Sequence, residues 1–348
     1  MILALVKEIR LASALKETSS QAHEPIETLY FGGGTPSLLD TFELNRIIRA
    51  FQERFEFSSD IEITLEANPD DITGPVLEEW QENGINRLSV GIQSFSNQEL
   101  KWMNRLHSAA EAKHCLELIG DSGIRNYSVD LIYGSPLLTD EGWKRNVDLV
   151  LEKDVPHLSC YALTVEPRTA LDTMINTGKK ASVDHASQAS QFVLLMEWMK
   201  QAGYEHYEIS NFARQGMRSR HNSSYWSGKP YYGFGPSAHS YDGKIRKWNI
   251  SNNAMYIASL QKDHVPFEAE TLSILQQMNE YTMTSLRTIE GLDLDYVRSR
   301  FGVAYAEKLK YLALKWESNG KLFKADGKLV LTREGKLFAD GIAADLFF

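Results

Sequence analysis

The feature that most restricts the fold is a regular alternation of apolar runs and helical patterns in the first half of the chain. Runs rich in β-branched and aromatic residues occur at 26–31, 61–67, 87–92, 127–134 and 157–163. Segments with helical periodicity, such as FELNRIIRAFQERF and EGWKRNVDLVLEKD, lie between the runs. This alternation predicts βα units and therefore an α/β fold with a parallel sheet.

Polar residues and glycines gather where the predicted strands end. Ligands bind at the carboxyl ends of the strands both in open α/β sheets and in α/β barrels. A single polar residue could instead cap a helix, but polar groups at five strand ends favour a binding site. These residues are Gly32, Gly33, Gly34, Glu66, Asn68, Gln93, Asp130, Thr164 and Glu166.

The sequence YFGGGTPS, residues 30–37, places three glycines directly after the first predicted strand. It is not a Walker-type phosphate loop, because no Gly-Lys-Ser/Thr follows, and it does not match GxGxxG. Glycines at this position allow a ligand to lie directly on backbone N–H and C=O groups. A plain tight turn is the alternative, although a turn rarely needs three glycines.

The composition is that of an ordinary globular protein: 43% of the residues are hydrophobic, 24% are charged and the net charge is -9. This balance argues against a general nucleic-acid binder, whose surface would be basic, so we expect no nucleic-acid partner. Cys115 and Cys160 are the two cysteines of the sequence and lie far apart. They form neither a disulfide framework nor a zinc knuckle, so a cytoplasmic location is the default expectation.

Several motifs together resemble the oxygen-independent coproporphyrinogen oxidase family of radical S-adenosylmethionine (SAM) proteins. They are YFGGGTPSLL, EANPDD, RLSVGIQSF, LKWMNRLHS, VDLIYGSP and LTVEPRTAL. RHNSSYW and GFGPSAHSY are similar to the haem-chaperone branch of that family. The resemblance extends from about residue 1 to the C-terminus. It implies a partial parallel (β/α) barrel of radical SAM type followed by a small, mainly helical C-terminal domain.

We expect three parts along the chain. They are a partial barrel over 1–215, a connecting region rich in aromatic residues, glycine and histidine over 216–265, and the C-terminal domain over 266–348. The C-terminal domain reads as two helices, then a helix, a hairpin turning at ADG and a final helix, which is the outline of a winged helix. Since the resemblance implies that this domain covers the barrel opening, we interpret it as a substrate lid or docking surface.

The resemblance implies S-adenosylmethionine as a cofactor. The glycine loop would lie against the methionyl part, and Glu66 would accept a hydrogen bond from the same ligand. Positions 93, 105, 130 and 164 match contacts to a second S-adenosylmethionine in the oxidase branch, and position 239 matches a contact to the first. The donor fork of Arg105 suits a carboxylate, although a surface helix arginine is the alternative. The candidate residues are Gly33, Gly34, Thr35, Glu66, Gln93, Arg105, Asp130, Thr164 and His239.

The chain departs from the family pattern in one respect. The family holds a [4Fe–4S] cluster through the motif CxxxCxxC after the first barrel strand, and this sequence has no such motif. We therefore predict no cluster ligands and no catalytic residue. Met1 opens inside a predicted helix, MILALVKEIRL, without a preceding cap. From this we expect an N-terminally truncated barrel that lacks its first strand and cluster loop, which would leave the run at 26–31 as an exposed edge.

A second candidate site lies in residues 217–249, a segment dense in aromatic residues, glycine and histidine. Aromatic faces and glycines suit a large planar ligand, and imidazole is a common axial ligand of haem iron. By the resemblance, His221 of HNxxYW is the candidate haem ligand, and Tyr225 and Trp226 could pack against a porphyrin. A histidine hydrogen-bonded within the loop is the alternative interpretation.

Two functions follow from the resemblance. The first is a haem-binding chaperone that delivers haem to a haem-acceptor protein, with S-adenosylmethionine and a cluster in accessory roles. An acceptor in a membrane would bring such a chaperone to the membrane surface. The second is an oxygen-independent coproporphyrinogen III oxidase, which decarboxylates porphyrinogen propionates by radical chemistry. HNxxYW and GFGPSAHSY favour the chaperone, and the missing cluster cysteines count against the oxidase. An inactive remnant is a third interpretation.

Overall fold

The structure is a computed structural model that describes residues 1–12 and 24–348. The chain forms two compact units that are interleaved along the sequence. Unit 1 comprises residues 1–29, 39–62 and 220–348, and unit 2 comprises residues 30–38 and 63–219. The chain therefore passes from one unit into the other four times.

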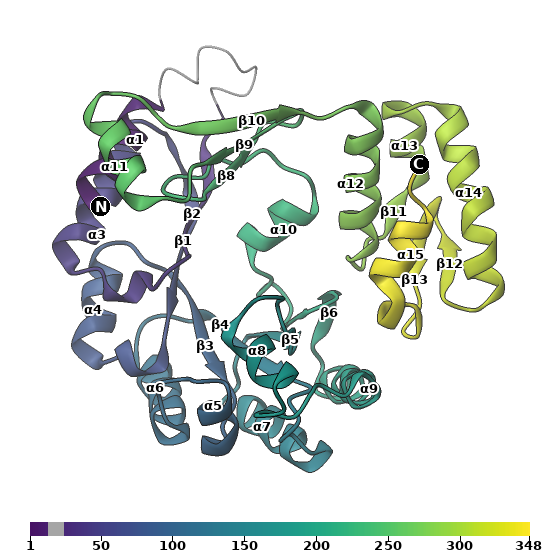
Figure 1. Ribbon diagram of the computed structural model, residues 1–348, viewed down its shortest axis with the longest axis horizontal. Coiled ribbons are helices and arrows are strands. Elements are labelled where there is room, and N and C mark those ends of the chain that lie inside the picture. The colour runs from purple at the N-terminus through teal and green to yellow at the C-terminus, as the bar shows by residue number, and fades with distance from the viewer. Residues whose placement is uncertain (13–23) are drawn as a thin grey trace. The chain divides into compact units, whose positions relative to one another are not determined.

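A seven-stranded sheet with the order β1-β2-β3-β4-β5-β7-β6 forms the predicted half-barrel (Figure 1). Strands β2 to β5 pair in parallel, and β7 pairs antiparallel to β5 and to β6. The five predicted strands are confirmed, although the second begins four residues earlier than predicted. β1 lies at one edge of this sheet. The strands are β1 Ile26–Phe31, β2 Phe57–Ala67, β3 Arg87–Gln93, β4 Asn126–Tyr133, β5 His157–Ala162, β6 Glu205–Glu208 and β7 Asn211–Ala213.

In unit 2, helices follow the strands and start at polar caps. Ser108 and Glu111 form a capping box at the start of α6, and Thr139 caps α7. Such caps satisfy backbone N–H groups that have no partner inside the helix. The helices of this unit are α4 Gly74–Glu82, α5 Asn97–Trp102, α6 Ala109–Asp121, α7 Asp140–Glu152, α8 Ala170–Asn176 and α9 His185–Gln201, with short 3-10 turns at η1 Pro36–Leu38 and η2 Pro69–Asp71.

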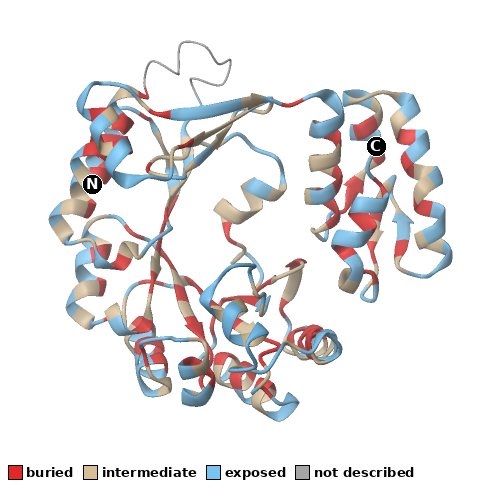
Figure 2. Ribbon diagram, in the orientation of Figure 1, coloured by how far each residue is buried: buried red, intermediate tan, exposed pale blue. Residues whose placement is uncertain are grey.

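The core of unit 2 consists of apolar side chains from the central strands and the helices (Figure 2). Val90 and Val129 are fully buried on neighbouring strands. Trp143 of α7 is also fully buried, and its indole N–H donates to the carbonyl of Gln191 on α9 at 3.2 Å. Because successive side chains of a strand point to opposite faces, the residues between these apolar positions are presented on the other face of the sheet.

In unit 1, α1 packs against α3 and α11, and a three-stranded antiparallel sheet has the order β10-β9-β8. The buried carboxylate of Glu8 on α1 accepts hydrogen bonds from Gly235 N at 2.8 Å, Asn249 Nδ2 at 2.6 Å and the hydroxyl of Tyr256. This network fixes the glycine-rich loop near residue 235 to two helices. The elements are α1 Ile2–Leu11, α3 Thr41–Gln52, α10 Arg220–Trp226, α11 Asn253–Gln261, β8 His239–Tyr241, β9 Ile245–Asn249 and β10 Phe267–Thr271.

The C-terminal part of unit 1 contains the predicted helices and hairpin (Figure 1). The hairpin turns at Asp326 and Gly327, which both have positive φ, as a tight two-residue turn requires. Its strands form a small sheet with the order β11-β13-β12. Among the described residues, no helix combines the length and apolarity needed to cross a bilayer. The elements are α12 Ile274–Leu286, β11 Leu292–Asp293, α13 Leu294–Arg300, α14 Val303–Ser318, β12 Leu322–Ala325, β13 Lys328–Leu331, η3 Gly335–Phe338 and α15 Ala339–Asp345.

Candidate functional site

In unit 2, a row of polar side chains crosses the central strands. The strand register pairs Glu66 with Ser89 and Asp130 with Ser159. Ser89 Oγ donates to Asp130 Oδ2 at 3.3 Å, and the hydroxyl of Tyr30 donates to Glu66 Oε1 at 2.8 Å. Glu66 and Asp130, which lie 64 positions apart in the sequence, therefore belong to one polar surface.

The glycine loop is bound to this surface through Glu66. Gly33 N donates to Glu66 Oε2 at 3.2 Å. A Cβ atom at Gly32 would lie 2.9 Å from Glu66 Oε1 and 2.6 Å from the ring of Tyr30, so a larger residue there would displace these two side chains. Gly33 and Gly34 have φ of 76° and 69°, which glycine adopts readily, and a Cβ at either would meet open space. The three glycines thus serve two purposes, close packing and a left-handed turn.

Burial shifts the pKa values of two charged groups of this polar surface, Asp130 and Arg105. Burial raises the pKa of Asp130 to about 6, helped by the nearby charge of Glu66 and opposed by hydrogen bonds from Ser159 and Ser89. Burial also lowers the pKa of Arg105, and the negative charge of Asp130 opposes that shift. The site therefore combines two carboxylates with a guanidinium group.

The other predicted residues of unit 2 lie at strand ends. Gln93 is buried at the end of β3, where the register shifts, and its φ of 65° is unusual for a residue other than glycine. Such backbone strain is common at functional sites. Thr164 is exposed beyond β5, and its hydroxyl donates to the carbonyl of Ala162 at 3.3 Å. The carbonyl of Thr35 accepts from Leu38 N at 3.1 Å, which closes the glycine loop.

The cysteines do not fit an iron–sulfur cluster. Cys115 lies on α6 and Cys160 on β5, and both are buried. Burial raises the pKa of the Cys115 thiol to about 12 and raises that of Cys160 well above its usual value. Cluster iron binds thiolates, at least three from the protein, so these two thiols do not suit it. The described residues also contain no group of His, Cys, Asp and Glu side chains arranged to hold a metal ion.

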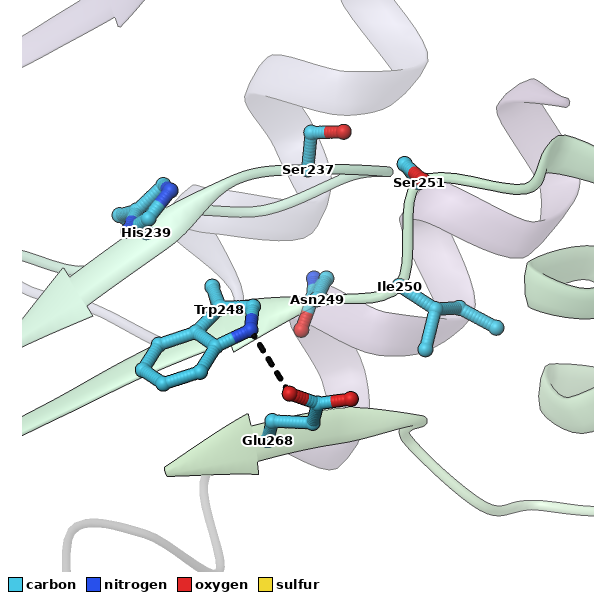
Figure 3. Close-up of a pocket in the computed structure, with 7 residues that line it drawn as sticks. All are labelled: Ser237, His239, Trp248, Asn249, Ile250, Ser251 and Glu268. Atoms are coloured by element: carbon cyan, nitrogen blue, oxygen red, sulfur yellow. Dashed lines mark hydrogen bonds between the residues drawn. The ribbon is translucent and has the colours of Figure 1, made fainter. Parts of the chain in front are cut away.

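His239 belongs to unit 1 and lines a small pocket of about 290 Å³ (Figure 3). Its ring centroid lies 6.2 Å from that of Trp248 on the adjacent strand, with the planes 30° apart. Trp248 Nε1 donates to Glu268 Oε2 at 3.2 Å, which orients the indole (Figure 3). The pocket thus offers an aromatic surface beside His239.

The HNxxYW motif forms the helix α10, and residues distant in sequence hold its first turn. The carboxylate of the buried Glu62 accepts from Arg220 N at 3.2 Å and His221 N at 3.0 Å. His221 Nδ1 is hydrogen-bonded to Thr28 Oγ1 at 2.9 Å. Burial lowers the pKa of His221 to about 4, so its imidazole is neutral at neutral pH. The ring of Tyr225 packs edge-on against that of His221, with centroids 5.0 Å apart.

A cavity of about 700 Å³ lies next to α10 within unit 1. This volume is in the range of about 300–1,000 Å³ typical of small-molecule and cofactor sites. Tyr225 and Trp226 line the cavity, whereas His221 lies one turn of α10 before Tyr225 and is not part of the wall. The aromatic residues of the wall are Tyr225, Trp226, Tyr231, Tyr241, Tyr281, Tyr296 and Phe301.

Sequence reasoning missed several residues of both sites. In the polar surface it missed Tyr30, Ser89 and Ser159, although polar residues at alternate positions of otherwise apolar strands were a usable signal. In the cavity it missed Tyr281 and Tyr296. These belong to C-terminal helices, and nothing in the sequence indicates that they approach α10.

Comparison with known proteins agrees with this architecture. The pattern of the radical SAM superfamily matches residues 6–150, and that of the HemN C-terminal domain matches residues 272–338. In structure, the chain is similar to coproporphyrinogen III oxidase (HemN) from Escherichia coli, with a TM-score of 0.83 and 22% identity, covering 99% of this chain and 82% of that one. The fold is therefore that of a radical SAM protein of the HemN type.

Sequence relatives narrow the class further. The chain is 30% identical to the heme chaperone HemW of Bacillus subtilis, over 95% of this chain and 88% of the relative. It is 36% identical to HemW of a Synechocystis species, over 86% and 73%, and 32% identical to HemW of Mycobacterium tuberculosis, over 99% and 85%. The chain belongs to the HemW family.

Proposed function

We propose that this protein binds haem and delivers it to a haem-acceptor protein in the cytoplasm or at a membrane surface. Its membership of the HemW family supports this function. The structural observation that carries it is the helix α10, where a neutral histidine is held in place by Thr28 and two aromatic residues of the same motif line a cavity of cofactor size.

In this proposal His221 is the axial ligand of the haem iron. Iron binds the neutral form of imidazole, and burial keeps His221 in that form at physiological pH. The hydrogen bond between Thr28 and Nδ1 fixes the orientation of the ring, as the outer partners of metal-bound histidines do. Tyr225 and Trp226 would pack against the porphyrin.

We also propose S-adenosylmethionine as a ligand of the half-barrel. Glu66 and Asp130 suit its ammonium group, Arg105 suits its carboxylate, and the exposed backbone of Gly33 and Gly34 allows close approach. The remaining proposed contacts in this unit are Thr35, Gln93 and Thr164. For His239, which belongs to unit 1, a contact to S-adenosylmethionine stays a prediction. When bound, the ligand would supply a sulfonium group. Because the cysteines present do not fit a cluster, we derive no step that depends on one.

Each of the three expected parts of the chain has its own proposed role. We propose that residues 1–215 bind S-adenosylmethionine, that 216–265 carry the haem motif and that 266–348 act as a lid or docking surface. Within this scheme α10 is the element on which haem binding depends.

A titration with haemin tests the function. We expect the unmodified protein to shift the Soret band on binding and His221→Ala to change that spectrum and weaken binding. His114→Ala, at an exposed histidine of α6, is the matched control and should behave as the unmodified protein.

Two results would contradict the proposal, one at the level of His221 and one at the level of the whole function. A Soret shift that survives His221→Ala unchanged would remove His221 as the axial ligand. Anaerobic decarboxylation of coproporphyrinogen by this chain, in the presence of S-adenosylmethionine and a reductant, would replace the chaperone function with that of the oxidase.

A further inference from the structure

The cavity beside α10 carries a charge opposite to that of the whole chain. The protein has a net charge of -9, yet the charged side chains of the cavity wall are three cations, Lys229, Arg246 and Arg300, and one carboxylate, Glu280. Burial raises the pKa of the wall residue Tyr281 to about 12, so its phenol adds no negative charge at neutral pH. The wall itself therefore lacks the acidic excess of the whole chain, and the partners of each cation decide which of them could bind an anion.

Two of these three cations are already neutralised by carboxylates. Arg246 Nη2 lies 2.9 Å from Glu280 Oε1, and its Nη1 lies 3.6 Å from Glu270 Oε1. Lys229 Nζ lies 2.6 Å from Glu27 Oε2. Neither group needs a further anion to balance its charge.

Arg300 differs from the other two cations. It is exposed at the end of α13, and within the described part of the chain its hydrogen-bond partner is a neutral amide, Gln277 Oε1, at 3.4 Å. A guanidinium group presents five donors in a planar fork that matches the two oxygens of a carboxylate. Arg300 is thus the wall residue with donors to offer an incoming carboxylate.

Two pairs of aromatic rings in the cavity wall give the cavity a preference for ring systems. Tyr225 and Tyr231 lie with their ring centroids 4.6 Å apart, and Tyr281 and Tyr296, from α12 and α13, lie 4.5 Å apart. Tyr225 and Tyr296 remain 41% and 44% exposed although both line the cavity. Exposed aromatic surface gathered in one cavity indicates a binding site for an apolar or aromatic ligand.

We propose that this cavity accepts a flat aromatic ligand that carries carboxylate groups, and that Arg300 of α13 binds one of those carboxylates. A porphyrin with propionate side chains has this chemistry, so the inference rests on the proposed function. It deepens that function by assigning the ligand's carboxylate end to C-terminal helices outside the HNxxYW motif. In this scheme Arg300 selects for the propionate, and the proposed bond of His221 to the iron, from outside the cavity wall, is tested separately.

The first test removes the positive charge of Arg300 from the protein and, separately, the negative charges of the propionates from the ligand. The unmodified protein, Arg300→Gln and Arg298→Gln are titrated with haemin and with haemin dimethyl ester, whose propionates are neutral. Arg298 is the matched control, because it lies on the same helix, pairs with Asp295 and Glu307, and does not line the cavity. We expect Arg300→Gln to weaken haemin binding about tenfold and to leave binding of the diester unchanged, while Arg298→Gln changes neither.

The second test fills the cavity. Thr284 of α12 lines it, whereas the neighbouring Met283 is 41% exposed and does not. We expect Thr284→Trp to weaken binding of both haemin and its diester about tenfold or more, because the indole occupies ligand volume, and Met283→Trp to bind as the unmodified protein does. Far-UV circular dichroism confirms that each variant is folded.

The outcomes separate this inference from the proposed function. Iron-free protoporphyrin IX has the same two propionates, so the effect of Arg300→Gln should persist with it and that of His221→Ala should disappear. If haemin binds but Arg300→Gln has no effect, or weakens haemin and diester equally, the role of Arg300 is overturned while the proposed function stands. Unchanged binding by Thr284→Trp overturns the cavity as the site. If the unmodified protein binds neither haemin nor protoporphyrin IX, both proposals fall.

Discussion

At the scale of single residues, the buried carboxyl group of Asp130 lowers the stability of the folded protein at neutral pH. The carboxyl group accepts from Ser89 and Ser159, yet burial and the charge of Glu66 raise its pKa to about 6. Between about pH 4 and pH 6 the folded protein therefore binds more protons at this group than the unfolded chain does. By linkage, the free energy of unfolding falls as the pH rises through this window, and the whole penalty is present above pH 6.

Asp130→Asn removes this penalty. We expect the substitution to raise the free energy of unfolding by about 1–2 kcal/mol at pH 7.5, because one pKa unit corresponds to about 1.4 kcal/mol and the group is only partly buried. The gain should vanish below pH 4, where Asp130 is protonated in both states. Urea unfolding at the two pH values measures it.

The same substitution should weaken S-adenosylmethionine binding in an equilibrium assay, since it removes one carboxylate from the site. Asp121→Asn, at an exposed aspartate of α6, is the control and should change the free energy of unfolding by less than about 0.5 kcal/mol. Destabilisation of Asp130→Asn at pH 7.5 would show that the charged form is favoured in the folded protein.

At the scale of secondary-structure elements, α10 depends on a residue far away in the sequence. Its first backbone N–H groups have no partner inside the helix, and Glu62 of β2 accepts two of them. Glu62→Ala would remove the acceptor of these two half-buried donors. We expect a loss of about 1–3 kcal/mol of unfolding free energy and weaker haemin binding with an altered Soret position, because His221 is the second residue of this turn.

Two further variants separate positioning from general stability. Glu62→Gln keeps one acceptor oxygen and should restore part of the haemin affinity. Glu56→Ala, at an exposed glutamate just before β2, should match the unmodified protein in both measurements. Equal haemin spectra for Glu62→Ala and the unmodified protein would rule out a positioning role for Glu62.

Elements were easier to predict from the sequence than sites. The five predicted strands and the C-terminal hairpin at Asp326 and Gly327 follow local patterns of apolar residues and turn residues, and the structure contains them. The contact between His221 and Thr28 joins residues 193 positions apart, and no local pattern reports it. The cavity is harder still to predict, because its wall combines α10 with α12 and α13, and its charge balance depends on which cations already have partners.

At the scale of the whole molecule, the strands β1 and β2 each begin in unit 1 and end in unit 2. Unfolding of β1 or β2 in one unit therefore also disrupts the strand pairing of the same strand in the other unit. We expect a single calorimetric transition in which the calorimetric and van't Hoff enthalpies agree. Two resolved transitions would contradict this expectation.

Variants in the two units provide an internal check. Tyr256→Phe in unit 1 removes the hydroxyl that donates to the buried Glu8, and should lower the unfolding free energy by about 1–2 kcal/mol. Asp130→Asn in unit 2 should act in the opposite direction at pH 7.5. Both substitutions should change the midpoint temperature of the same calorimetric transition.

The interleaved order of the chain also bears on how such proteins diversify. Every residue that lines the cavity beside α10 lies between Asn222 and Phe301, after the last passage of the chain into unit 1. A single genetic crossover following Ser219 would therefore exchange the complete cavity wall between two relatives. Thr28 and Glu62, which form hydrogen bonds with the first turn of α10, would still be encoded by the recipient gene. One recombination event can thus replace the whole cavity wall and change which ligand it binds. The incoming segment must still offer Thr28 a histidine ring and Glu62 two backbone N–H groups.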